Sequence, residues 1–79
     1  SNSVITEDTI WSGDIVITSD VEVAEGVVLT INDEFTIPEG IVLTNSGTLI
    51  INDSLIIEGQ VVNTGTLTVL GSGSLVIRG

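Results

Sequence analysis

The sequence predicts an all-β fold, in which the chain winds into a single-stranded parallel β-solenoid with about 20 residues and three short strands in each coil. The first observation is a repeat. Residues 31–37 (INDEFTI) match residues 51–57 (INDSLII) at an offset of 20, and residues 75–77 lie 20 beyond residues 55–57. The second is that the apolar runs are only three to five residues long, rich in β-branched side chains, and alternate with period 2. Runs this short exclude helices.

The turns between these runs are rich in Gly, Asn, Asp and Ser, which tolerate turn geometry. The expected strands cover residues 15–17, 21–23, 27–31, 35–37, 41–44, 48–51, 55–57, 60–62, 66–69 and 75–77. Four turn glycines follow acidic or polar residues and are expected to have positive φ, which only glycine adopts readily: Gly26, Gly40, Gly59 and Gly65. Two extra residues in segment 70–74, compared with 52–54, place the length variation at a corner.

A 20-residue coil stacks equivalent side chains into inward columns, with about 4.8 Å between neighbours. The expected columns are Leu29, Leu49 and Leu67; Ile31, Ile51 and Val69; Phe35, Leu55 and Leu75; and Ile37, Ile57 and Ile77. A second match, of residues 21–30 with residues 35–44 at an offset of 14, leaves the phasing of the first coil open. The whole chain is expected to form one domain (1–79), with an N-terminal cap at 1–14 and stacked coils at 15–79.

Composition excludes several classes of function. Eleven acidic residues against Arg78 alone give a formal net charge of −10, which repels nucleic-acid backbones and anionic lipid surfaces. The sequence has no His, Cys, Lys or Tyr, so the usual bases and nucleophiles of catalysis are missing. No apolar run approaches the roughly 18 residues of a membrane helix. We therefore expect no enzyme, no cofactor, no nucleic-acid partner and no membrane insertion.

The corner residues Asp33, Glu34 and Asp53 form a weak candidate site for Ca²⁺, because stacked turns bring carboxylate and carbonyl oxygens together. The alternative is a solvated corner in which Asn side chains bond along the stack. The calcium-binding β-roll repeat Gly-Gly-x-Gly-x-Asp is absent. Asp33 and Asp53, on adjacent coils, would also lie near the separation that two carboxylates need for glycoside hydrolysis, but neither an aromatic platform nor a cleft-building insertion accompanies them. A flat threonine array is disfavoured, since Ile50 separates Thr30 from Thr68 in their column.

Residues 9–17 (TIWSGDIVI), followed by residues 21–31 (VEVAEGVVLTI), resemble the opening coils of right-handed parallel β-helices in bacterial surface proteins, of the autotransporter-passenger and adhesin-stalk type. The phrases at residues 45–49 (NSGTL) and 63–67 (NTGTL) are similar to the degenerate repeats of those proteins. The resemblance implies a right-handed coil, an extracellular or cell-surface setting, and a capping role for the first strand. It implies no particular activity, because that family includes adhesins, stalks and enzymes.

These observations favour a non-catalytic structural module that associates with itself, as a fibre, stalk or adhesin scaffold. Alternation points Ile50, Ile56 and Val76 outward, and Leu75 and Ile77 lie in the last coil with no polar capping segment after them. Trp11 precedes the first expected strand, where its ring would cover the N-terminal end of the core. The expected partners are further copies, or further coils of a longer solenoid. The alternative function is a small carbohydrate- or ligand-binding module.

Overall fold

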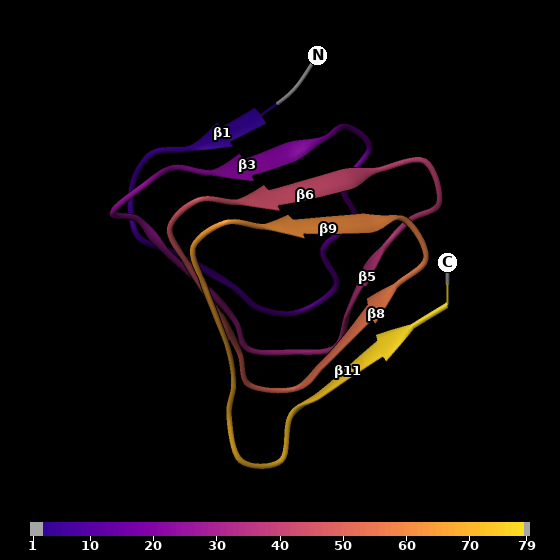
Figure 1. Cartoon of the computed structure of the whole chain (residues 1–79). Coiled ribbons are helices and arrows are strands. Elements are labelled where there is room, and N and C mark those ends of the chain that lie inside the picture. The colour runs from indigo at the N-terminus through magenta and orange to yellow at the C-terminus, as the bar shows by residue number, and fades with distance from the viewer. Residues whose placement is uncertain (1–2, 79) are drawn as a thin grey trace.

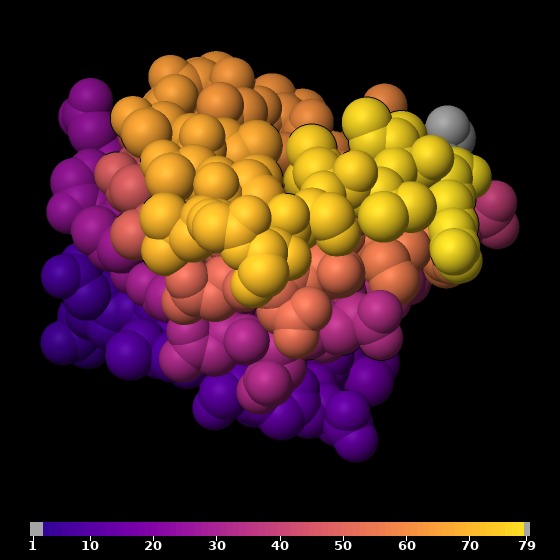
Figure 2. All heavy atoms as spheres, turned by 90° about the horizontal axis from the view of Figure 1, so that it is seen from below, coloured from indigo at the N-terminus to yellow at the C-terminus, as the bar shows by residue number. Residues whose placement is uncertain are grey.

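Parallel pairing between segments about one coil apart builds the whole fold. The computed structural model describes residues 3–78 as an all-β solenoid of about 4 turns, and these residues contain no helix. Three parallel sheets form the sides of the coil, and each turn of the chain contributes at most one strand to each sheet. Figure 1 looks along the axis of the stacked turns, and Figure 2 shows the turns as successive layers from the N-terminus to the C-terminus.

The sheets are named A, B and C in the order in which the chain meets them. Sheet A contains β1 (Ser3–Ile5), β3 (Val21–Val23), β6 (Val42–Asn45) and β9 (Gln60–Asn63). Sheet B contains β2 (Thr9–Trp11), β4 (Val28–Ile31), β7 (Thr48–Ile51) and β10 (Thr66–Val69). Sheet C contains β5 (Phe35–Ile37), β8 (Ser54–Ile57) and β11 (Ser74–Ile77). The four coils therefore begin with β1, β3, β6 and β9.

The coil is right-handed, as the figures show. In Figure 1 the chain runs along β9, down the side occupied by sheet B, and back along β11, which is a counter-clockwise path. Figure 2 views the same molecule from below and places the C-terminal coil uppermost, so this coil lies nearest the viewer in Figure 1. A counter-clockwise path that advances toward the viewer is a right-handed helix. This hand agrees with the general preference of parallel β-crossovers.

The expected strands from residue 21 onward are confirmed to within one residue at each end. The expected strand at 15–17 is wrong, because this segment has no strand geometry although Ile15 and Ile17 pack partly against the core. The segment follows a turn in which the Gly13 N–H donates to the Asp33 carboxylate, and its residues Ile15 and Val16 line a hollow together with Thr36 of β5. The segment 1–14, expected as a cap, carries β1 and β2, and residues 1, 2 and 79 lie outside the described residues.

The four predicted inward columns are confirmed by the strand register. Leu49 aligns with Leu29 on one side and with Leu67 on the other, and the other three columns follow the same order. The register also settles the phasing of the first coils, since Val21 aligns with Leu43 and Leu43 with Val61. The match at an offset of 14 therefore aligns β3 with β5 and β4 with β6, which lie in different sheets, and it is not a stacking period.

The core lies inside the second and third coils, where each column is covered on both sides. Its fully buried side chains are Val23, Leu29, Ile31, Ile37, Leu43, Asn45, Leu49, Ile51 and Leu55. Side chains of the first and last coils, such as Ile5 and Val61, are only partly buried against this cluster. Burial therefore falls toward both ends of the axis, as expected when each coil contacts only its neighbours.

The corner glycines serve two different physical needs. Gly26 and Gly40 have φ of 83° and 84°, which confirms the expectation for these two positions. The same expectation is wrong for Gly59 and Gly65, whose φ is not positive. A Cβ at Gly59 would collide with the carbonyl oxygens of Pro38 and Ile41 in the preceding coil, and a Cβ at Gly65 would meet that of Gly47. At these corners glycine is needed because adjacent backbones approach closely.

The position of a residue along its column determines the effect of a charge. Leu55→Asp buries a carboxylate at a site with 0% exposure, at a cost of several kcal/mol, and should abolish the β-sheet circular dichroism spectrum. The matched control is Leu75→Asp, in the same column but 39% exposed, which should keep the spectrum with only a modest loss of melting temperature. A folded Leu55→Asp variant would contradict the column assignment.

Candidate functional site

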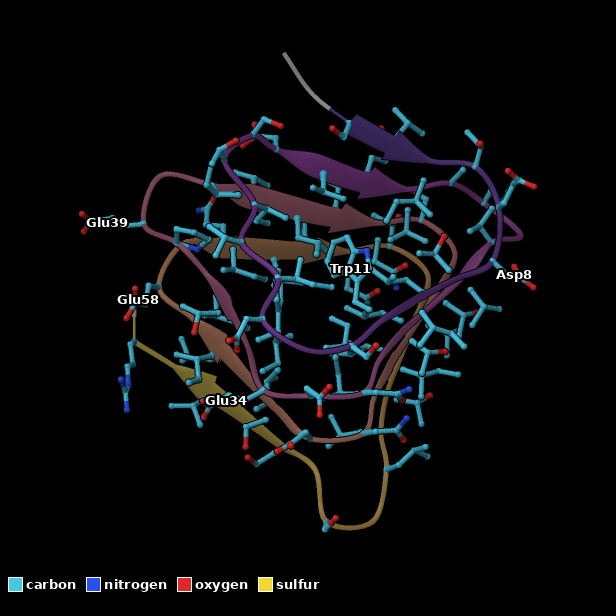
Figure 3. All side chains as sticks on the ribbon, turned by 180° about the vertical axis from the view of Figure 1, so that it is seen from behind. Asp8, Trp11, Glu34, Glu39 and Glu58 are labelled. Carbon is cyan, nitrogen blue, oxygen red and sulfur yellow. The ribbon has the colours of Figure 1, made fainter. Side chains whose placement is uncertain are left out.

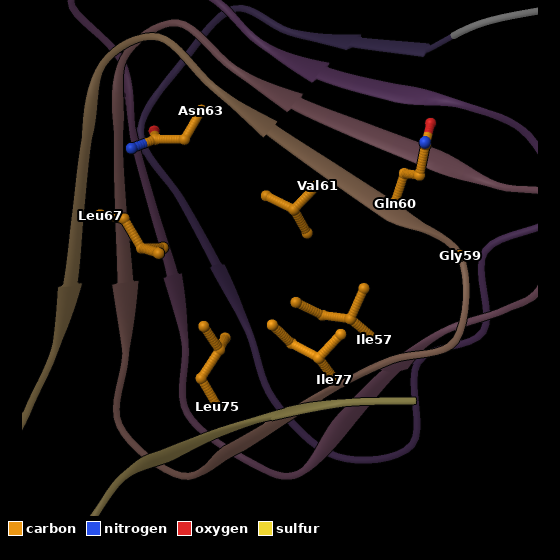
Figure 4. Close-up of a pocket in the computed structure, with 8 residues that line it drawn as sticks. All are labelled: Ile57, Gly59, Gln60, Val61, Asn63, Leu67, Leu75 and Ile77. Atoms are coloured by element: carbon orange, nitrogen blue, oxygen red, sulfur yellow. The ribbon is translucent and has the colours of Figure 1, made fainter. Parts of the chain in front are cut away.

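The candidate site is the edge of the last coil, where no strand among residues 3–78 pairs with β9, β10 or β11 on their outer side. We call this edge the C-terminal face, defined by the inward side chains of the last coil: Val61, Asn63, Leu67, Val69, Leu75 and Ile77. It contains a hollow of about 410 Å³, whose apolar lining is Ile57, Val61, Leu67, Leu75 and Ile77. Figure 4 shows these side chains pointing into the space inside the coil, whereas Gln60 points away from it.

The side chains of the C-terminal face are exposed because their columns continue on one side only. Leu75 is 39% exposed and Ile77 is 69% exposed, although Leu55 and Ile57 beneath them are 0% and 6% exposed. The sequence patterns of the two pairs are the same. The difference in exposure therefore arises because no strand among residues 3–78 lies beyond β11, and not because the side chains change direction. Within these residues the face is a core surface open to solvent.

The backbone of the last coil also leaves hydrogen-bonding groups free. The N–H groups of Ser74, at the start of β11, and of Arg78, just after its end, donate to the carbonyl oxygens of Asp53 and Ile57 in the preceding coil, at 3.1 and 2.8 Å. Because backbone groups alternate in direction along a parallel strand, the N–H and C=O of Val76 also point toward β8. Those of Leu75 and Ile77 point the other way, away from the preceding coil. The same alternation holds on β9, fixed by the bond from Gln60 to Ile41, and on β10, fixed by the bond from Thr66 to Gly47.

An asparagine pair joins the last coil to the third and was missed by the sequence analysis. Asn45 has 0% exposure, and its Nδ2 donates to Asn63 Oδ1 and to the carbonyl oxygen of Thr66, both at 2.8 Å. Its own Oδ1 has no partner, because the residue aligned with it on the other side is Val23. The available signal was the repeated Asn two positions before Gly, at 45–47 and 63–65. The pair places Asn63 at the C-terminal face.

At the opposite end, Trp11 lies in β2 and aligns with Ile31. Its ring packs on Phe35, with ring centroids 5.0 Å apart and planes inclined by 50°. Figure 3, which views the molecule from the N-terminal side, shows Trp11 in the middle of the coil, whereas Asp8, Glu39 and Glu58 point away from it. Trp11 is half-buried. The ring therefore lies at the N-terminal end of the column that Ile31 and Ile51 continue.

The outer faces carry apolar side chains, but those that the sequence analysis singled out are not the most exposed. Ile50, Ile56 and Val76 alternate with inward residues as expected, and each is half-buried. Ile10 and Val16, both in the first coil, are 65% and 79% exposed. On sheet B, Ile50 lies between Thr30 and Thr68 in one outward column, as expected. Apolar exposure on the outer surface is therefore scattered.

The candidate calcium corner is held together by hydrogen bonds within the chain. The Asp33 carboxylate accepts from the Gly13 N–H, and Asp53 Oδ1 accepts from the Ser54 N–H at 2.8 Å. Asn52 Nδ2 donates to Asn32 Oδ1 at 2.6 Å, which confirms the expected bonding of Asn side chains along the stack. Glu34 is exposed. Residues 3–78 contain no group of three or more acidic side chains placed to hold a metal ion.

Charge is distributed unevenly along the axis. The first coil carries Glu7, Asp8 and Asp14. The second carries Asp20, which stacks against Val42 at the start of the third, together with Glu22, Glu25, Asp33, Glu34 and Glu39. The third carries only Asp53 and Glu58. From Gln60 to Arg78 the last coil has no acidic residue and carries Arg78, the single cation of the sequence. The C-terminal face is thus the end of the molecule with the least negative charge.

None of the protein-family models, curated proteins or solved structures compared with the chain matches it. Among the described residues there is also no helix with the length and hydropathy needed to span a membrane. What can be concluded about function therefore comes from the geometry and chemistry of this chain.

Proline substitutions on β11 should distinguish the N–H groups that pair with β8 from the N–H groups that point away from it. Val76→Pro removes an N–H that faces β8, and leaving its carbonyl partner unpaired should lower the free energy of unfolding by about 1–3 kcal/mol. Ile77→Pro removes an N–H that faces outward, so the free energy of unfolding should change much less. Urea denaturation followed by circular dichroism measures both. Equal destabilisation by the two variants would show that the assigned alternation is wrong.

Proposed function

We propose that the chain is a non-catalytic structural module, part of a stalk, fibre or adhesin scaffold of an extracellular or cell-surface protein, and that it associates with itself through its C-terminal face. The observation that carries the proposal is the exposure of Leu75 and Ile77 in columns whose other members are buried. Columns of this kind are completed when another coil is added. A structural module that grows by stacking coils needs such a surface.

The free energy available at this face is large enough for association. Full burial of a Val, Leu or Ile side chain is worth roughly 1.5–3 kcal/mol, and four such side chains line the hollow from the last coil alone: Val61, Leu67, Leu75 and Ile77. Completing their partial burial would contribute a few kcal/mol, and strand pairing with the free backbone groups would add to it. Repulsion between exposed charges opposes contact but is largely screened beyond about 10 Å at 0.1 M salt.

A non-catalytic role is supported by the inventory of side chains, since His, Cys, Lys and Tyr are absent from the whole sequence. Four of the carboxylates, those of Asp8, Asp20, Asp33 and Asp53, accept hydrogen bonds from backbone N–H groups. The Asp8 and Asp20 carboxylates accept from the N–H groups of Val28 and Val42 in the following coil, both at 3.0 Å. The proposed extracellular setting is supported by the resemblance of residues 9–31, 45–49 and 63–67 to bacterial surface β-helices.

Binding of a small ligand is the competing function, and the hollow itself is the observation that favours it. Its volume of about 410 Å³ lies within the range of small-molecule sites, which is roughly 300–1,000 Å³. Its lining is mostly aliphatic, however, and neither Trp11 nor Phe35 belongs to it, so it has no aromatic platform for a sugar. A free strand edge around an aliphatic hollow is better suited to another coil.

Sedimentation velocity of the 79-residue chain tests the proposal. Across protein concentrations at physiological salt, the weight-average mass should rise above the 8.2 kDa of one chain. Ile77→Glu should reduce this association, because it places a charge in the C-terminal face. The control is Ile50→Lys together with Ile56→Lys, which alters the outer faces and should leave association unchanged.

A chain that stays monomeric from low to physiological salt would contradict the proposed self-association. Binding of one aliphatic small molecule to each monomer would then favour the competing function. Loss of association in the Ile50→Lys and Ile56→Lys variant, with retention in Ile77→Glu, would show that the copies meet through their outer faces.

A further inference from the structure

We infer that the partner of the C-terminal face is the N-terminal edge of a second copy, so that copies stack head to tail with their strands parallel. The inference rests on the proposed function and adds the identity and orientation of the partner. It follows from three observations at the two ends of the solenoid: the direction of the free backbone groups, the order of the columns, and the distribution of charge.

The free backbone groups of the two ends are complementary in sheets A and B, where both ends of the solenoid have a strand, β1 and β9 in one and β2 and β10 in the other. At the N-terminal edge the Ser3 N–H donates to Asp20, and the Ile5 carbonyl accepts from Ala24, so both residues face the second coil. Because backbone groups alternate in direction, the N–H and C=O of Val4 point away from the second coil. The Asn32 N–H donates to the Trp11 carbonyl, so Trp11 faces the second coil and the backbone groups of Ile10 also point away from it. At every junction between two coils, the bonded backbone groups belong to residues with inward side chains in the earlier coil and to residues with outward side chains in the later coil. The free backbone groups of the last coil belong to residues with inward side chains, and those of the first coil belong to residues with outward side chains. The two ends therefore have the combination that every internal junction has.

The side-chain columns also continue across such a junction. In the register found inside the molecule, Leu67 of one copy would meet Thr9 of the next, and Val69 would meet Trp11. In sheet A, Val61 and Asn63 would meet Ser3 and Ile5. On the third side, where the first coil has no strand, Leu75 and Ile77 would face the segment that contains Ile15 and Ile17, which already pack partly against the core. The half-covered residues of both ends would be buried by one contact.

The distribution of charge favours this orientation over the others. A head-to-tail junction brings the last coil, with Arg78 and no acid, against the first coil with its three carboxylates, Glu7, Asp8 and Asp14. Contact between two N-terminal edges would oppose three carboxylates with three more. Contact between two C-terminal faces would bring the two Arg78 side chains to the same junction. Opposite charges at an interface chiefly select the orientation of the partners, and here they favour the head-to-tail orientation.

A head-to-tail contact is heterologous, so each copy keeps one free end of each kind and the stack does not close. This gives a sharp test, because each end can be blocked separately. Val4→Pro with Ile10→Pro removes outward N–H groups from the N-terminal edge. Val69→Pro with Ile77→Pro removes them from the C-terminal face. All four residues are at least 40% exposed, and none of the four N–H groups pairs within the molecule in the alternation described above.

The experiment is sedimentation velocity of the two blocked variants, alone and mixed in equal amounts, after circular dichroism has shown that both keep the β-sheet spectrum. Each variant alone should remain monomeric under conditions in which the unblocked chain associates. The mixture should form a species of twice the monomer mass and no larger, because it contains one intact end of each kind.

Other outcomes separate this inference from the proposed function. Dimers of the N-terminally blocked variant alone would mean that two C-terminal faces pair, which overturns the head-to-tail orientation and leaves self-association standing. A mixture that stays monomeric, while the unblocked chain associates, also overturns the orientation. If each variant alone associates to the same extent as the unblocked chain, neither end takes part in the contact. If the unblocked chain is itself monomeric, the proposed function is wrong.

Discussion

The structure depends on one constraint, the parallel register that places each residue above its equivalent in the preceding coil. The register requires an apolar side chain at alternate positions of every strand, and it requires corners that fit closely over one another. Columns such as Leu29, Leu49 and Leu67 satisfy the first requirement. Corner residues such as Gly47, where a Cβ would meet the carbonyl oxygens of Ala24 and Val27, satisfy the second. A change of register by one residue would place core side chains in solvent.

The same constraint explains why the sequence predicts the middle of the molecule better than its ends. The columns through Leu49, Ile51, Leu55 and Ile57 could be predicted because each strand there has a neighbour with a similar sequence. The first coil has no such advantage, since Thr9 and Trp11 occupy the column positions of Leu29 and Ile31. Its two strands were therefore not expected, and the expected strand at residues 15–17 lacks the backbone pairing that its alternation indicated.

The candidate site shows a similar division. Leu75 and Ile77 could be assigned to an open end from their columns alone, whereas the pairing of Asn45 with Asn63 required knowledge of the distance between two corners. The half-burial of Ile50 and Ile56 was also beyond a pattern argument, because neighbouring side chains on the outer face cover part of each. Alternation gives the direction of a side chain, but its exposure depends on the residues around it.

The dependence of each coil on its neighbours has a consequence for the dynamics of the molecule. The third coil is held on both sides, whereas the last coil is held by β6, β7 and β8 alone. Local opening should therefore begin at the first and last coils, each of which is held on one side only, and proceed inward, as in other solenoids with nearest-neighbour stability. Amide protons of β7 and β8 would exchange slowly and those of β10 and β11 rapidly. The hydrogen bonds from Asn45 to Asn63 and Thr66 would then hold the corner between β9 and β10 for longer than the rest of that coil.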